Sequence, residues 1–226
     1  MKKLLLTATV LLGAFSLYAQ EIEDKEPLAV EGSEQISSLR LAADLVKYGY
    51  AQKSALPLID ALQIIAENQA QPGDSQKEEE SVEVDLGGKQ GNVTLNIPEI
   101  AKAAAEFSDG DVTLLALLTQ VQNEAAAPSR GAVGGAKYNV DVVKANGTDT
   151  YNISFVAGRL AEVAVSGDGD TDLDLYVYDS NGNLIEKDAD YTDDCYVSWV
   201  PKWTGRFKIK IVNRGRVANR YVLITN

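Results

Sequence analysis

The stretch TDLDLYVYDSNGNLIEKD, residues 171–188, decides the fold that we expect for the second half of the chain. Apolar and polar residues alternate through its first nine positions, which predicts a β-strand with one buried and one exposed face. Leu173, Leu175 and Val177 would point into a core. The Asn181-Gly182 pair that follows is typical of a turn joining two antiparallel strands.

The same period of two continues through the rest of residues 138–226. Many short strands separated by turns that contain glycine and asparagine predict a β-sandwich or barrel. Cys195, Val197 and Trp199 share one strand face, so the single cysteine of the chain is expected to be a buried thiol. The candidate strands are residues 137–143, 149–157, 160–167, 171–179, 183–188, 195–200, 205–213 and 220–225.

Residues 34–126 instead show the spacing of amphipathic helices. Ser33 is a suitable N-cap for the first helix and Gly49 a suitable end, while Pro57 fits the first turn of the second helix. A break at residues 108–110 is expected to separate two further helices. This half is therefore expected to hold about four helices arranged as hairpins.

Two segments interrupt these patterns. Proline, glycine and a run of glutamates predict a charged, solvated loop at residues 72–92, although alternating apolar residues over 82–97 also allow a small hairpin. Small residues at 127–137 predict a flexible linker. The expected fold is α+β with two domains: a helical domain at 34–126 and an antiparallel, jelly-roll-like β-sandwich at 138–226.

The first 19 residues have the parts of a secretory signal peptide. Lys2 and Lys3 precede a short apolar run, and Ala19 is a small residue at the expected cleavage point. The apolar run is too short to cross a bilayer comfortably. We therefore expect the mature chain to start near Gln20 with a mobile leader at residues 20–33 and to be exported to the periplasm, the cell surface or the medium, without membrane insertion after cleavage.

Charge and composition exclude several function classes. The formal net charge is −12, and removing Lys2 and Lys3 with the signal would make it −14, which disfavours nucleic acid as a partner. The chain contains no histidine, so neither a Ser-His-Asp relay nor a histidine-ligated zinc site can be built. Carboxylate chemistry, a lysine-based mechanism and oxygen-ligated calcium or magnesium stay open.

Acidic residues crowd the turn that enters the strand at 171–179. Carboxylates this close repel one another unless water solvates them or a cation is shared between them. Calcium accepts six to eight oxygen ligands in loose geometry, so Asp170, Asp172 and Asp174 form a candidate calcium site. A solvated turn without an ion is the alternative. A catalytic carboxylate pair would need a cleft between the two groups, which a turn on a small sandwich does not offer.

Three tyrosines are expected on outward-facing strand positions. Tyr176 and Tyr178 lie opposite the apolar set of their strand, and Tyr196 lies on the non-core face of another strand. Together they form a candidate aromatic surface for binding a polymer or a protein. Ordinary cross-strand packing of tyrosines is the alternative.

The strand half resembles the bacterial pre-peptidase C-terminal domain. The elements that carry the resemblance are an Ala-Gly strand end at 157–158, a Gly/Asp turn at 167–170, an Asp-x-Asp-Leu-Tyr strand at 172–176, Asn-Gly at 181–182 and WTGRF at 203–207. The resemblance implies a jelly-roll-like sandwich that is itself not catalytic and is appended to secreted proteases and other exported proteins. Relatives in clostridial collagenases bind calcium and collagen. No peptidase domain precedes the sandwich here.

The helical half resembles tetratricopeptide helix pairs in the stretch AADLVKYGYAQKSALPLIDAL, residues 42–62, without a full repeat signature. These features predict an exported, non-catalytic binding or scaffolding protein that contacts a protein or an extracellular polymer. The alternative is an accessory or inhibitory partner of a separately encoded secreted hydrolase. An enzyme is the third hypothesis.

Overall fold

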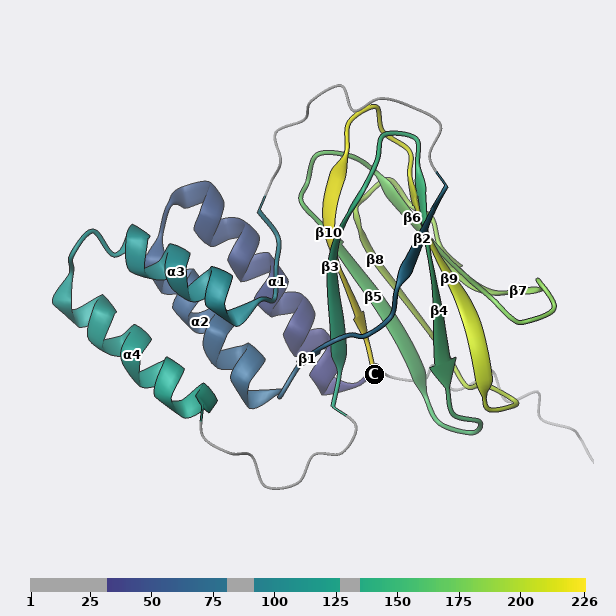
Figure 1. The fold of residues 1–226 in the computed structure, drawn as a ribbon, viewed down its shortest axis with the longest axis horizontal. Helices are drawn as coiled ribbons and strands as arrows, with labels where there is room; N and C mark the ends of the chain where they lie inside the picture. Colours follow the sequence, from purple (N-terminus) through teal and green to yellow (C-terminus); the bar gives the residue numbers. More distant parts are fainter. Residues whose placement is uncertain (1–31, 81–91, 127–134) are drawn as a thin grey trace, which may run out of the picture.

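The computed structural model describes residues 32–80, 92–126 and 135–226. The predicted signal peptide and nearly all of the leader lie outside these residues, as does most of the predicted linker. The described residues form four helices and two packed β-sheets, so the predicted α+β fold with a sandwich is confirmed. Figure 1 shows the helices gathered against one side of the sandwich.

The helices occur where the periodicity predicts them: α1 (Glu34–Gln52), α2 (Ala55–Glu67), α3 (Ile97–Phe107) and α4 (Val112–Ala126). Ser33 caps α1, because its hydroxyl oxygen accepts a hydrogen bond from the Ile36 N–H at 3.3 Å. Asp111 caps α4 in the same way, accepting from the Thr113 N–H at 2.8 Å. No helix in the described ranges is long and apolar enough to cross a bilayer.

The predicted helix end at Gly49 is wrong. α1 continues for three more residues to Gln52, and Lys53 forms the C-cap in the left-handed conformation with φ of 49°. Gly49 is needed for another reason: a Cβ at this position would lie 2.6 Å from a Leu58 methyl carbon of α2. The glycine therefore permits a close helix contact and does not stop the helix.

The eight predicted strands are all present as β3 (Lys137–Val143), β4 (Thr148–Phe155), β5 (Ala161–Gly167), β6 (Leu173–Tyr178), β7 (Leu184–Asp188), β8 (Asp194–Trp199), β9 (Gly205–Asn213) and β10 (Asn219–Thr225). They divide between two sheets that pack face to face. Sheet A has the order β1-β3-β10-β5-β8, and sheet B has the order β2-β4-β9-β6-β7. All the pairings among the eight predicted strands are antiparallel.

Two short strands form at the start of the segment predicted as a charged loop, the first of them beginning one residue before it. β1 (Gln71–Pro72) joins the edge of sheet A next to β3, and β2 (Lys77–Glu80) joins the edge of sheet B next to β4. The alternative hairpin at 82–97 is not formed, because residues 92–96 have no strand structure and Ile97 begins α3; residues 82–91 lie outside the described part of the chain.

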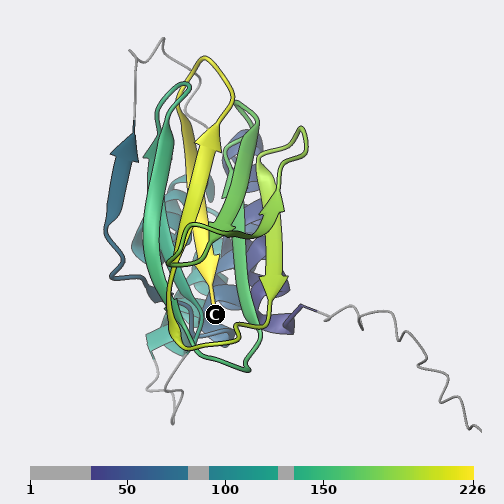
Figure 2. The same ribbon diagram turned by 90° about the vertical axis from the view of Figure 1, so that its right-hand side faces the viewer.

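Two hydrophobic cores fill the molecule. The first lies between the sheets and includes Leu173, Leu175, Val177, Cys195 and Trp199, as the alternation predicts. The second lies between the helices and the outer face of sheet A, where it takes in four buried residues of that sheet: Tyr138, Ala164, Val222 and Ile224. Sheet A is therefore buried on both faces. In Figure 2 sheet B lies in front and the helices lie behind the sandwich, so the helices do not cover the outer face of sheet B.

Polar contacts hold the helices onto sheet A. The buried Glu162 of β5 accepts hydrogen bonds from the Ser33 N–H at 2.7 Å and from the Tyr196 hydroxyl at 2.8 Å. Arg220 of β10 donates to both carboxylate oxygens of Glu99 in α3, at 3.0 and 3.1 Å. The helical half and the strand half therefore form a continuous packed body.

Candidate functional site

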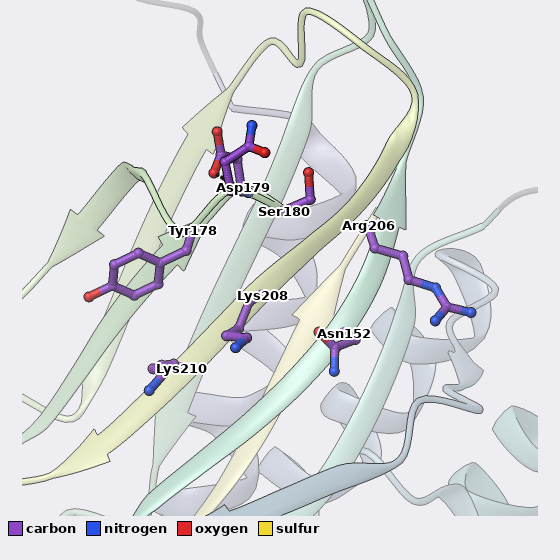
Figure 3. Close-up of a pocket in the computed structure, with 9 residues that line it drawn as sticks. Asn152, Tyr178, Asp179, Ser180, Arg206, Lys208 and Lys210 are labelled. Atoms are coloured by element: carbon purple, nitrogen blue, oxygen red, sulfur yellow. Dashed lines mark hydrogen bonds between the residues drawn. The ribbon is translucent and has the colours of Figure 1, made fainter.

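The candidate site is the outer face of sheet B, which the described helices leave uncovered (Figure 2). Side chains pointing away from the core on β4, β6 and β9 alternate with the buried ones. We call the set of Asn152, Tyr176, Tyr178, Arg206, Lys208 and Lys210 the sheet B face. Figure 3 shows most of it, with Tyr178, Lys208, Lys210 and Asn152 lying on three neighbouring strands.

Strand register sets the order of these side chains. Tyr178 of β6 is paired with Lys208 of β9, and Lys208 is paired on its other side with Asn152 of β4. Two residues along the strands, Tyr176 is paired with Lys210. The register thus places a row of cations on β9 between an aromatic row on β6 and a polar row on β4.

The two tyrosine rings lie close together, with centroids 6.4 Å apart and an interplanar angle of 24°. The Tyr176 hydroxyl donates to Asp174 at 2.9 Å and accepts from Arg214 at 3.0 Å. Arg214 also forms an ion pair with Asp174 at 2.5 Å. These contacts fix the Tyr176 ring. Loss of solvent and the bond to Asp174 raise the pKa of its hydroxyl above the usual value, although the bond from Arg214 acts in the opposite direction.

The cations of this face are largely unneutralised. Arg206 and Lys208 are exposed, and neither forms an ion pair with any residue in the described part of the chain. Lys210 lies 3.8 Å from Glu80 of β2, a distance at which an exposed pair contributes little. A positively charged row on a protein with a net charge of −12 is a local reversal of the overall charge.

A hollow of about 690 Å³ opens on this face, lined by Asn152, Tyr178, the cationic row of β9 and the turn at 179–182. Asp179 builds that turn, because its carboxylate accepts hydrogen bonds from the N–H groups of Asn181 and Asn183 at 2.8 Å each. Gly182 takes a left-handed φ of 84°, which the turn requires. The β6–β7 hairpin thus forms a rigid rim beside Tyr178.

The predicted aromatic surface is only partly formed. Tyr176 and Tyr178 share the sheet B face, but Tyr196 belongs to β8 of sheet A. There Tyr196 lies beneath α1, with the Arg40 guanidinium 5.3 Å from its ring centroid. The inclusion of Tyr196 was wrong, because alternation along a strand shows which residues share a face of that strand and not which sheet the strand joins.

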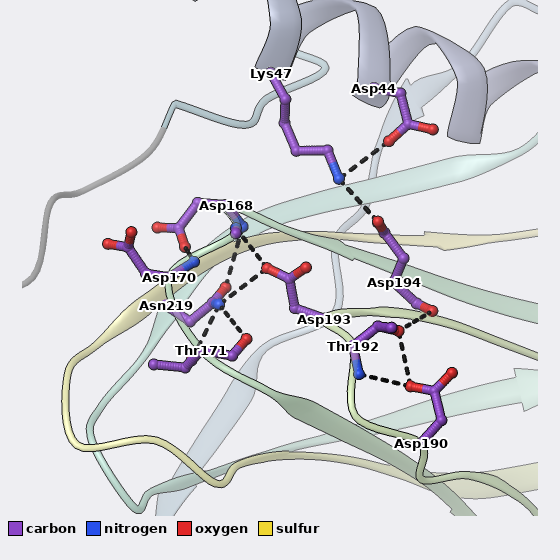
Figure 4. Close-up of polar contacts among 11 residues, drawn as sticks. Asp44, Lys47, Asp168, Asp170, Thr171, Asp190, Thr192, Asp193, Asp194 and Asn219 are labelled. Atoms are coloured by element: carbon purple, nitrogen blue, oxygen red, sulfur yellow. Dashed lines mark hydrogen bonds and ion pairs between the residues drawn. The ribbon is translucent and has the colours of Figure 1, made fainter. Parts of the chain in front are cut away.

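The acidic residues gather in the loops at residues 168–172 and 189–193, where most of their carboxylates are used to build the loops (Figure 4). Asp168 accepts from the N–H groups of Arg220 and Asp170, at 2.9 and 3.1 Å. Asp193 accepts from Gly169 N–H at 2.6 Å and from the Asn219 side-chain amide at 3.1 Å. Burial and these neighbouring acids raise the pKa of Asp168 to about 6.

The three residues of the predicted calcium site lie differently. Asp174 points to the outer face of β6, where it is paired with Arg214. Asp172 has one buried carboxylate oxygen without a hydrogen-bond partner among the described residues, and burial raises its pKa. Asp170 lies in the loop beside Asp168 (Figure 4). No group of three or more acidic or cysteine side chains in the described ranges is placed to hold a metal ion. Calcium binding stays a prediction.

The remaining ionic network closes the edge of the sandwich. Lys77 of β2 contacts Asp141 at 3.2 Å and Asp149 at 3.3 Å, and Tyr221 donates to the same Asp149 oxygen at 2.7 Å. Asp149 is almost fully buried, so loss of solvent raises its pKa above the usual value. This network has a structural role: it attaches β2 to β4 of its own sheet and to β3 of sheet A.

Comparisons with known proteins add little to this geometry. No family model matches the chain, so the resemblance to the pre-peptidase C-terminal domain stays a prediction. No curated protein matches either.

Some solved structures are distantly similar. PliG of Aeromonas hydrophila, a periplasmic inhibitor of g-type lysozyme, has 14% identity and a TM-score of 0.34, over 44% of this chain and 92% of that one. Salmonella Typhimurium PliG has 18% identity and a TM-score of 0.26, over 40% and 89%. The CBM22-1–GH10 modules of Clostridium thermocellum xylanase 10B, complexed with xylohexaose, have 13% identity and a TM-score of 0.25, over 39% and 24%. These TM-scores are too low to establish a common fold.

Proposed function

We propose that this chain is an exported, non-catalytic binding protein whose contact surface is the sheet B face. The observation that carries the proposal is the difference between the two sheets. The outer face of sheet A carries apolar residues under the helices, whereas that of sheet B carries two half-buried tyrosines and a row of exposed or half-exposed cations. Tyrosine and arginine are enriched at binding surfaces, and lysines on an open face attract an anionic ligand.

The absence of histidine from the sequence supports a binding role over catalysis, because the commonest general base is missing. Among the acidic side chains of the loops at 168–172 and 189–193, Asp168 accepts from backbone N–H groups, and Asp193 accepts from a backbone N–H and a side-chain amide. Asp168 and Asp193 therefore have a structural explanation that needs no reaction. Export rests on the signal-like residues 1–19.

A retention assay tests the proposed surface. Purified protein would be sedimented with insoluble bacterial cell-envelope material, and the bound fraction measured. We expect the double variant Tyr176→Ala/Tyr178→Ala to bind about tenfold more weakly, because removing two central aromatic anchors costs on the order of 1–2 kcal/mol or more. An unchanged melting temperature would show that the variant is folded.

Tyr48 on α1 and Tyr191 in the β7–β8 loop provide matched controls, since they are 58% and 97% exposed but lie away from the sheet B face. The variants Tyr48→Ala and Tyr191→Ala should be retained like the wild type. Retention that survives loss of Tyr176 and Tyr178 but disappears with Tyr48 would place the contact surface on the helices and refute the proposal.

A further inference from the structure

The row of cations on β9 has a linear arrangement that suggests the kind of ligand. Arg206, Lys208 and Lys210 occupy alternate positions of one strand, so their attachment points follow one another at intervals of about 7 Å. Arg206 and Lys208 form no ion pair within the described ranges. Unneutralised charges in line along an open face are complementary to an extended anionic chain.

The rows on either side of the cations differ in chemistry. Tyr176 and Tyr178 lie on one side, half-buried and with their rings nearly parallel, and they supply aromatic surface there. On the other side Asn152 faces Lys208, and Ser154 faces Arg206. Amide and hydroxyl groups can both donate to and accept from the hydroxyl groups of a sugar. The sheet B face therefore combines three kinds of group. It has aromatic rings for the apolar side of a sugar, polar groups for its hydroxyls and cations for its acidic substituents.

The backbone around these side chains argues against a peptide ligand that binds by adding a strand. β9 is paired with β4 on one side and β6 on the other. Its N–H and C=O groups are consequently used within sheet B, whereas an added peptide strand needs the free backbone groups of a sheet edge. Recognition on this face must come from side chains alone.

A second hollow is less suited to an anionic ligand. This hollow of about 630 Å³ shares Asn152 and Arg206 with the first, but it is also lined by the Asp74–Lys137 ion pair and by Glu78, which accepts from the Asn152 amide. Carboxylates would repel an anionic ligand there. The favourable path thus runs along β9 between Arg206 and Lys210.

We infer that the sheet B face binds a linear acidic polysaccharide along β9, with the β6 tyrosines beneath the sugar rings and the β9 cations on the acidic groups. This inference rests on the proposed function, because it assigns a ligand class to the same face. Lys208 pairs in register with both Tyr178 and Asn152, so it occupies the centre of the site.

Isothermal titration of the full chain with polygalacturonate, a linear chain of acidic sugars, tests the inference. We expect binding that weakens with added salt, because ions screen exposed charges. Fully methyl-esterified polygalacturonate, which is neutral, should bind about tenfold more weakly or not at all. Dextran sulfate provides an arm with sulfate in place of carboxylate, and binding of either acidic glycan supports the inference.

Matched lysine variants locate the site. Lys208→Gln/Lys210→Gln should lower the affinity for polygalacturonate about tenfold or more, since each removes a charge-assisted contact. Lys53→Gln/Lys102→Gln removes the same charge from exposed positions on the helical side and should leave the affinity unchanged. Equal losses in the two double variants would indicate an effect of net charge alone and would overturn the inference.

Two further results would also overturn it. Poly-L-glutamate binding as tightly as the acidic glycans would show that the face does not recognise sugars. Failure of both acidic glycans to bind, while Tyr176→Ala/Tyr178→Ala still loses retention on envelope material, would refute the acidic polysaccharide and leave the proposed binding face in place.

Discussion

The two sheets of the sandwich are built from the same alternation, but their outer faces have different chemistry. Sheet A places Ala164, Val222 and Ile224 on its outer face, where the helices bury them. At corresponding outward positions sheet B has Tyr178, Lys208 and other polar side chains, which are exposed or half-buried. The inner faces therefore determine the fold, whereas the outer faces determine what each sheet contacts. Sheet A contacts the helices and, we propose, sheet B contacts a ligand.

The largest expected effect comes from placing a charge on each outer face in turn. Val222→Lys on β10 puts an ammonium group at a fully buried position beneath the helices and should lower the free energy of unfolding by about 3–5 kcal/mol. Val212 on β9 lies half-exposed on the outer face of sheet B, in register with Asp174. Val212→Lys should therefore change the free energy of unfolding by less than about 1 kcal/mol. Urea denaturation measures both. Equal losses would mean that the two faces do not differ as described.

A smaller effect should follow from releasing the edge of sheet B. Lys77→Met removes the cation beside the buried Asp149, and leaving that carboxylate unpaired should cost about 3 kcal/mol. Lys144→Met breaks only the exposed pair with Glu79 and should cost about 0.5 kcal/mol or less. The comparison between the lysines fails if Lys144→Met destabilises the protein as much as Lys77→Met.

A third expected effect, which varies with pH, concerns the acidic loops at 168–172 and 189–193. The pKa of Asp168 is about 6 in the folded protein against 3.8 for an unperturbed group, so the folded state binds the proton more tightly. Its contribution to stability is therefore fully present below the unfolded pKa and is lost as the pH rises through the folded pKa.

Asp168→Asn removes this titration. The melting temperature of the variant, relative to the wild type, should rise as the pH increases from about 4 to about 7, because only the wild type pays for a buried charge over that range. Calorimetric scans at a series of pH values measure the difference. A difference that does not vary with pH would contradict the raised pKa.

Much of the fold could be predicted because the two kinds of element have different periods. All four helices and eight strands follow from hydrophobic spacing. β2 was missed because Lys77–Glu80 is a charged edge strand, which has no apolar face of its own. The packing of the helices on sheet A was also not predicted. It could have been, because Val222, Leu223 and Ile224 are consecutive apolar residues, which indicates a strand buried on both faces.

The candidate site could be predicted only in part. Tyr176 and Tyr178 follow from alternation, but the placement of Tyr196 depends on which sheet β8 joins, which is a long-range property. The cationic row was detectable in GRFKIKIVN, where Arg206 and Lys208 alternate with buried residues. The acidic net charge of the whole chain concealed this local reversal.

The most direct test of the account is to map polygalacturonate binding by nuclear magnetic resonance on the isotopically labelled protein. Titration should shift the amide signals of β9 around Lys208 and those of β6 around Tyr178, while signals of α1 and α2 stay unchanged. Shifts confined to the helices or to the acidic loops at 168–172, with none on β9, would contradict it.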